Sequence, residues 1–312
     1  MTITMPTVRP VLSWETLEVG DDLGTVSGVV GEEAVRAHAF AIGDDPRRYL
    51  DGIDGVGPFV PPSLLSNELL KLFMIGYDCT PPWEGGFHTR SQIDYRAAIP
   101  IGSEITITGS HVAKFRSRGR RHRSCTTEAR LRDGTVAVRM TATETMGYLV
   151  TDEPDEGSAP EDWARGWPRV EPGTVAGTGL LGPTSRLVGM AESAIFSGYP
   201  FAWAHETPQW IRAGLHTDPV IAARAGFGAP VVQGLVSASH HTSLLIEQFG
   251  ERALRNTSLS LAFISSVLVG ERLTSRAAPV SGLRDDADVL ALVSTRGDGG
   301  DAVTVGYAVV GR

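Results

Sequence analysis

Hydrophobic residues crowd one long segment in the second half of the chain. Within VVQGLVSASHHTSLLIEQFG (231–250), apolar residues occupy positions 235, 236, 238, 244, 245 and 246, so little polar face remains. Gly250 is a typical residue at the end of a helix. The pattern therefore predicts a long helix that other elements of the fold surround.

Alternation of apolar and polar residues, typical of half-buried strands, follows this helix and also fills the middle of the first half. ADVLALVSTR (287–296) and DAVTVGYAVV (301–310) flank GDGG, which is a hairpin signal. In the first half, EITITGSHVAKF (104–115), RHRSCTTEARL (121–131) and TVAVRMTATETMGY (135–148) are separated by breaks that contain glycine. One central helix against a run of antiparallel strands predicts an α+β unit.

A segment without either periodicity separates two such units. Residues 151–182 are rich in proline, glycine and acidic side chains, as linkers are. We therefore expect a first unit at 1–150, a linker at 151–182 and a second unit at 183–312.

The two units match each other loosely along the chain. Three pairs of segments follow in the same order: YLD (49–51) with HTD (216–218), VPPSLLS (60–66) with APVVQGL (229–235), and IDYRAAIPIGSEITI (93–107) with LSLAFISSVLVGERL (259–273), where Gly102 meets Gly270. Three anchors at nearly constant separation indicate an internal repeat. We expect the two units to pack as a pseudo-dimer within the chain, and a homodimer of chains stays open.

Composition narrows the class of protein. The 312 residues include 36 acidic and 28 basic side chains, and the net charge of −8 argues against a nucleic-acid binder, which needs a basic face. Cys79 and Cys125 are too few for a disulfide framework or a cysteine-based metal site, and no histidine spacing favours a metal. Without a signal peptide or a membrane-spanning apolar run, we expect a cytoplasmic protein that acts on a small molecule.

Several of these segments together resemble the MaoC-like hydratases and dehydratases in their double-hotdog form. The first half does so through WETLEVGD, PPSLLS, GGFHTRSQIDYRAAIPIGSEI and KFRSRGRRHRS, and the second through LHTDPVIAARAGFGAPVVQGL and LAFISSVLVGERL. The resemblance implies two hotdog units, each with a long central helix wrapped by an antiparallel sheet. It also implies reversible addition of water to a 2-enoyl thioester of coenzyme A or an acyl carrier protein, without a cofactor.

The acid/base pair of the family is split between the halves. R-specific members carry an aspartate followed five residues later by a histidine. The second half supplies His216, but Ile211 stands five residues before it. The first half has Asp44, but Tyr49 stands where the histidine is expected. Neither half therefore carries the complete pair.

His216 is the leading catalytic candidate because imidazole titrates near neutral pH, although a residue that only ends a loop would look the same. Asp218 is a second candidate, but Asp218 before Pro219 is also the arrangement of a helix N-cap and first turn. Upstream, His205 and Glu206 are possible replacements for the missing aspartate, or simply part of a solvated loop.

The start of the predicted long helix is the candidate oxyanion site. Gly234, with Gln233 and Leu235 beside it, would offer free backbone N–H groups to the thioester oxygen. Close packing of helix against sheet would explain the glycine equally well.

Further candidates for substrate binding lie in the first half. Two histidines of the second half are instead expected in the core. Asp44, Tyr49 and His88 could face a cleft, while His240 and His241 read as hydrogen-bonded core residues. In the basic run 114–123, Arg118 and Arg121 could bind the phosphates of coenzyme A or an acidic carrier protein. Charged edges of an exposed hairpin are the competing interpretation.

Three hypotheses follow for function. The first is a hydro-lyase acting on 3-hydroxyacyl or 2-enoyl thioesters, with His216 as acid/base. The split Asp/His pair also suits a non-catalytic scaffold that binds acyl thioesters. A thioesterase or cyclase on the same fold, with altered chemistry, is the third.

Overall fold

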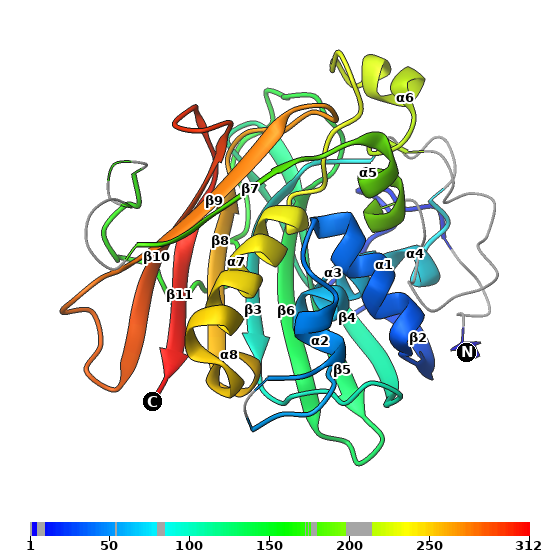
Figure 1. Cartoon of the computed structure of the whole chain (residues 1–312). Coiled ribbons are helices and arrows are strands. Elements are labelled where there is room, and N and C mark those ends of the chain that lie inside the picture. Colours follow the sequence, from blue (N-terminus) through cyan, green and yellow to red (C-terminus); the bar gives the residue numbers. More distant parts are fainter. Residues whose placement is uncertain are drawn as a thin grey trace.

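The fold is built on one curved antiparallel sheet (Figure 1). We describe it from a computed structural model, for residues 2–4, 10–53, 55–79, 85–171, 173, 175, 180–197 and 214–312. The strands are β1 (Thr2–Thr4), β2 (Asp22–Val29), β3 (His88–Tyr95), β4 (Glu104–Ser117), β5 (Arg120–Leu131), β6 (Val136–Thr145), β7 (Leu181–Leu187), β8 (Thr257–Phe263), β9 (Arg272–Pro279), β10 (Ala287–Arg296) and β11 (Ala302–Gly311). Their order in the sheet is β1-β2-β4-β5-β6-β3-β8-β11-β10-β9-β7.

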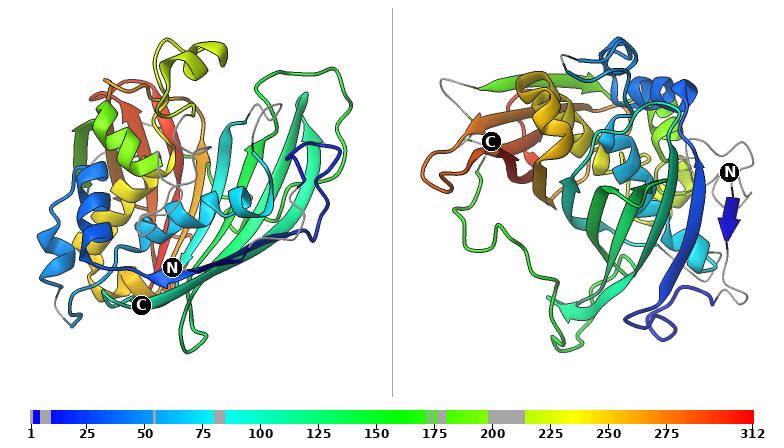
Figure 2. Two further views of the ribbon diagram at one scale, coloured as in Figure 1. Left: turned by 90° about the vertical axis from the view of Figure 1, so that its right-hand side faces the viewer. Right: turned by 90° about the horizontal axis from the view of Figure 1, so that it is seen from below.

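Helices α3 and α7 lie side by side on one face of the sheet, which curves around them (Figures 1 and 2). The helices are α1 (Glu32–Ile42), α2 (Arg47–Leu50), α3 (Pro62–Lys71), α4 (Phe73–Gly76), α5 (Met190–Ser197), α6 (Pro219–Arg224), α7 (Leu235–Phe249) and α8 (Glu251–Arg255). Both α3 and α7 are buried over most of their length, and Leu65 of α3 and Leu245 of α7 belong to one continuous core. The predicted central helix ending at Gly250 and the predicted β10–β11 hairpin are confirmed.

The same backbone hydrogen bonds occur in each half. Equivalent pairs are Val60 N–H to Ile99 O and Val232 N–H to Val267 O, both 2.8 Å, and Gly102 N–H to Val30 O and Gly270 N–H to Val188 O, also both 2.8 Å. The halves meet where β3 pairs with β8, with Gln92 opposite Ser260. The described chain is thus a duplicated α+β unit joined through its two central strands.

These hydrogen bonds correct the expected match between the halves in two places. Arg96 and Ile264 donate to the equivalent carbonyls of strands β6 and β11, so Arg96 corresponds to Ile264 rather than to Ala262. Tyr49 O accepts from Phe59 as Leu215 O accepts from Val231, so Leu50, not Tyr49, stands where the second half has His216. Short apolar strings match almost equally well in neighbouring registers, whereas hydrogen bonds fix one.

The expected linker packs on the sheet face opposite the helices. Arg116 and Glu156 exchange backbone hydrogen bonds of 2.8 and 3.1 Å. Trp167 stacks edge-on between Trp163 and Tyr307, and the Tyr307 hydroxyl donates to Pro168 O at 2.8 Å. β7 already begins at Leu181, and the division at residues 150 and 182 stays a prediction. None of the described helices is long and apolar enough to cross a membrane.

Candidate functional site

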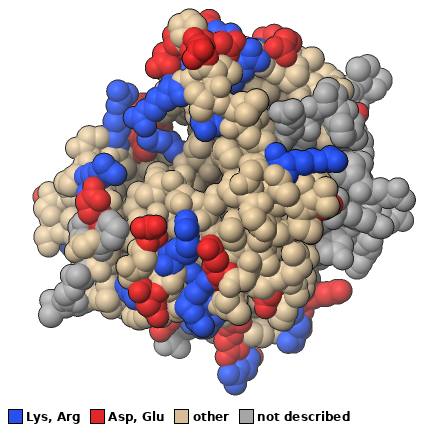
Figure 3. Space-filling model, turned by 90° about the horizontal axis from the view of Figure 1, so that it is seen from above, with Lys and Arg blue, Asp and Glu red and all other residues tan. Residues whose placement is uncertain are grey.

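A cavity of about 650 Å³ lies where the halves meet. The first half contributes the end of α3, α4, residues 85–89 and the end of β6. The second half contributes residues 214–217, the start of α7 and the segment 263–267 after β8. Seen from above, the molecular surface is hollowed and rimmed mainly by uncharged residues (Figure 3). A ligand in this cavity would therefore contact both halves.

His216 lines the cavity and presents one nitrogen to it. Its Nδ1 lies 2.6 Å from Val231 O. Since a carbonyl only accepts, Nδ1 carries the proton and Nε2 keeps its lone pair. Burial lowers the pKa of His216 below its usual value of 6.5; the hydrogen bond to Val231 opposes this shift, and the nearby Lys71 charge adds to it. A neutral imidazole at pH 7 is a competent general base.

The start of α7 lies beside His216. Gly234 is the N-cap, and the N–H groups of Gln233, Gly234 and Leu235 donate no hydrogen bond to another described residue. The Gln233 side chain is 8% exposed and lines the cavity, whereas the Leu235 side chain is buried in the core. A Cβ on Gly234 would lie 2.7 Å from the Phe263 ring, so close packing also requires the glycine.

Asp218 does not reach the cavity. Its Oδ1 accepts from Val220 N–H at 2.8 Å and from Ile221 N–H at 3.4 Å, which caps α6. The capping interpretation is confirmed, and the structure leaves Asp218 outside the cavity lining.

Asp44 and Tyr49 also lie away from the cavity. The Tyr49 hydroxyl donates to Asp44 Oδ2 at 2.5 Å and contacts Ser243 Oγ of α7 at 3.1 Å. Burial, together with the Asp44 carboxylate, raises the pKa of Tyr49. These residues bind the first half to α7 and are not brought to His216.

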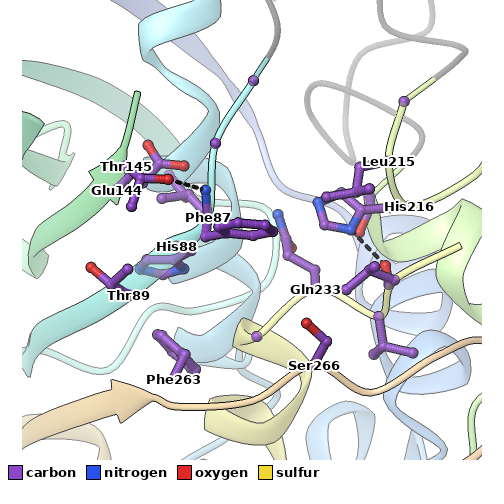
Figure 4. A pocket seen from close by; sticks show the side chains of 18 of the residues that line it. Phe87, His88, Thr89, Glu144, Thr145, Leu215, His216, Gln233, Phe263 and Ser266 are labelled. Atoms are coloured by element: carbon purple, nitrogen blue, oxygen red, sulfur yellow. Dashed lines mark hydrogen bonds between the residues drawn. The ribbon is translucent and has the colours of Figure 1, made fainter. Parts of the chain in front are cut away.

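His88 does line the cavity, at the wall formed by β3 (Figure 4). Its Nε2 lies 3.0 Å from Arg90 O and 2.8 Å from Ser91 Oγ, and its ring packs against Phe263 with centroids 4.5 Å apart. Burial lowers the pKa of His88 to about 3, so it is a neutral part of the wall.

The arginines of the basic run have different surroundings, and one of them lines the cavity. Arg121 makes two hydrogen bonds to Glu153, at 2.7 and 2.6 Å, and Arg118 is exposed at the β4–β5 turn with φ 52°. Neither lines the cavity, but Arg120 does: it donates to Tyr148 O at 2.9 Å and lies over the Phe87 ring.

Sequence reasoning missed charged groups of the first half that line the cavity. Glu144 is partly buried and pairs with Arg123 at 2.5 Å. Burial lowers the pKa of Lys71, which pairs with Glu68 at 3.4 Å. The sequence feature that could have pointed to Lys71 is its position inside the apolar string LLKLF (69–73), where a charged side chain is unusual.

The remaining candidates fall into two groups. His205, Glu206 and Ile211 lie outside the described residues. His240 and His241 are buried, with Nε2 atoms 3.0 Å from Ile42 O and Ser294 Oγ respectively, which confirms them as core histidines. Among the described residues, no group of three or more histidine, cysteine, aspartate or glutamate side chains could hold a metal ion.

Two helices enclosed by one duplicated antiparallel sheet define the double hotdog fold. A MaoC-like dehydratase from Phytophthora capsici has this architecture with a TM-score of 0.65 and 16% identity, over 92% of this chain and 95% of that one. A Mycobacterium tuberculosis protein with a double hotdog fold matches with a TM-score of 0.60 and 13% identity, over 96% and 97% of the two chains. The expected fold class and pseudo-dimer are therefore confirmed.

Sequence similarity adds the family. The MaoC-like domain model matches residues 212–292. An (R)-specific enoyl-CoA hydratase from Aeromonas caviae is 36% identical over 98 residues, which make up 31% of this chain and 72% of that hydratase. The chain belongs to the MaoC-like hydratase and dehydratase family.

Proposed function

We propose that the protein is a hydro-lyase that interconverts 2-enoyl and 3-hydroxyacyl thioesters of coenzyme A or an acyl carrier protein. The observation that carries the proposal is the neutral His216, whose Nε2 meets the cavity beside N–H groups at the start of α7 that donate to no other described residue. The similarity to an enoyl-CoA hydratase supports the thioester substrate.

The geometry suits each step of hydration. His216 Nε2 removes a proton from water as the oxygen bonds to C3, and the C2=C3 electron pair moves to the thioester oxygen. Backbone N–H groups at Gly234 and Leu235 stabilise this oxyanion, aided by the positive end of the helix dipole. Protonated His216 then returns the proton to C2, and dehydration is the reverse.

The first-half wall is suited to the acyl chain. Leu70, Phe73 and Met74 line the cavity from α3 and α4, and Phe87 lies nearer to His216 (Figure 4). Burial of chain methylenes against these residues would contribute about 0.8 kcal/mol per CH₂.

The test is turnover of a panel of 2-enoyl and 3-hydroxyacyl thioesters by the wild type, His216→Ala and the control His122→Ala. His122 stacks on Phe115 outside the cavity lining. We expect His216→Ala to lower kcat/KM by about 10²- to 10⁴-fold, as for loss of a general base, and His122→Ala to retain turnover. Equal activity of His216→Ala would refute the mechanism. Release of free thiol would show a thioesterase, and binding without conversion a scaffold.

A further inference from the structure

We propose that Gln233 is a catalytic residue that replaces the missing aspartate: its Oε1 and His216 Nε2 together hold the reacting water. The inference rests on the proposed function and assigns the second acceptor of that site.

The position of Gln233 carries the inference. It directly precedes the N-cap of α7, and its side chain stands between Phe87 and His216 in the cavity (Figure 4). More than nine-tenths of it is buried, yet Oε1 accepts no hydrogen bond from a described residue. Buried amide oxygens are nearly always paired, because desolvation without a partner is costly. An acceptor left open at this point is suited to a donor that arrives with the substrate.

The hydrogen-bonding needs of water identify that donor. A water that attacks C3 must aim a lone pair at carbon, so both of its hydrogens need acceptors elsewhere. His216 Nε2 takes one. Among the described residues that line the cavity, Glu144 carries the only carboxylate, and Arg123 binds it at 2.5 Å. Three buried atoms of the described lining lack a described hydrogen-bond partner: Gln233 Oε1, His88 Nδ1 and Ser197 Oγ. Gln233 lies nearer to His216 than His88 does (Figure 4), so we assign the second hydrogen of the water to Gln233 Oε1.

An amide oxygen orients the water but does not take its proton. The proton lost from water goes to His216 and returns to C2, so one ionisable group completes the cycle. Among the described residues, the other charged or titratable groups whose electrostatic effects reach His216 are Lys71 on α3 and His88 on β3. Burial keeps His88 neutral, with a pKa of about 3. The pH profile of kcat/KM should therefore show a single acid limb, at a pKa below 6.5, followed by a plateau.

Three variants separate this role from a structural one. Gln233→Leu removes the acceptor at similar volume, and Gln233→Glu keeps an acceptor but adds a charge. Gln248→Leu makes the same change as the first variant on the exposed end of α7 and serves as the control. Circular dichroism and thermal melting establish that each variant is folded before kinetics are measured.

For Gln233→Leu we expect kcat to fall on the order of 100-fold, as for a misplaced reactant, while KM for a 2-enoyl-CoA stays within about twofold. Gln233→Glu should recover turnover and move the acid limb to higher pH, because a carboxylate raises the pKa of its histidine neighbour. Gln248→Leu should match the wild type.

The inference is overturned if folded Gln233→Leu keeps its kcat, or if the wild-type profile is bell-shaped and Glu206→Gln abolishes the second limb. In either case His216→Ala still tests the hydro-lyase separately. A wild type without turnover would instead remove the proposed function itself.

Discussion

The two halves share one hydrogen-bonded frame but place different chemistry on it. Where the second half has His216, the first has Leu50. Two residues after the equivalent Val232 and Val60 stand Gly234 and Pro62, and a proline has no N–H to offer an oxyanion. The first half thus lacks both the base and the donor at its corresponding position. In the proposed mechanism the second half therefore supplies the base and the oxyanion donors, and the first half contributes cavity wall.

The first half uses the vacated region for packing. Asp44 and Tyr49, beside the position of the absent base, join its helices to Ser243 on α7. Because these contacts cross between the halves, the two halves share one core, and changes in either should affect the stability of both.

Acid should break this shared core, and it is the largest effect we expect. Burial lowers the pKa of His38, His88 and His111 in the first half to about 3, and those of His240 and His241 in the second to about 4 and about 3. Unfolded histidines titrate near 6.5, so this stability is complete above pH 6.5 and is lost as pH falls towards the folded pKa values.

At pH 5 each of these five histidines costs about 2 kcal/mol of the free energy of unfolding, and their sum rivals the whole stability of a typical domain. Urea unfolding followed by circular dichroism from pH 8 to 5 measures the loss. We expect one cooperative transition that shifts to lower urea. Two separate transitions would mean that the halves unfold independently, and an unchanged midpoint would contradict neutral burial.

Local sequence signals predicted the elements better than the cavity. The apolar run of α7, the glycine at its end and the Asp218–Pro219 cap each depend on neighbours within a few residues, and each was confirmed. Lys71 and Arg120 line a cavity that exists only because the two halves meet. The halves meet through the pairing of β3 with β8, which joins residues far apart in the chain. The register of the repeat likewise needed hydrogen bonds that short apolar strings cannot specify.

Tyr49→Phe tests the structural use of the first half. Loss of the hydroxyl leaves Asp44 Oδ2 and Ser243 Oγ without that partner, and we expect the free energy of unfolding to fall by about 1–3 kcal/mol. Turnover per folded molecule should not change, since neither residue lines the cavity. Tyr307→Phe, which removes one hydrogen bond on the opposite sheet face, is the matched control. A drop in kcat for Tyr49→Phe but not for Tyr307→Phe would instead indicate that Asp44 and Tyr49 take part in catalysis.

The smallest expected effect concerns the basic run, which Arg118 and Arg121 represent. Because Glu153 already binds the Arg121 guanidinium, we expect Arg121→Ala to leave KM for a coenzyme A thioester unchanged. Arg118 is exposed, and a phosphate contact there should raise KM for Arg118→Ala less than about fivefold at low salt, with no effect at high salt. A pantetheine thioester, which lacks the nucleotide phosphates, should show no difference between the variants. If Arg118→Ala and the wild type have the same KM for the coenzyme A thioester at every salt concentration, Arg118 makes no phosphate contact. The basic run would then be assigned to the hairpin edge.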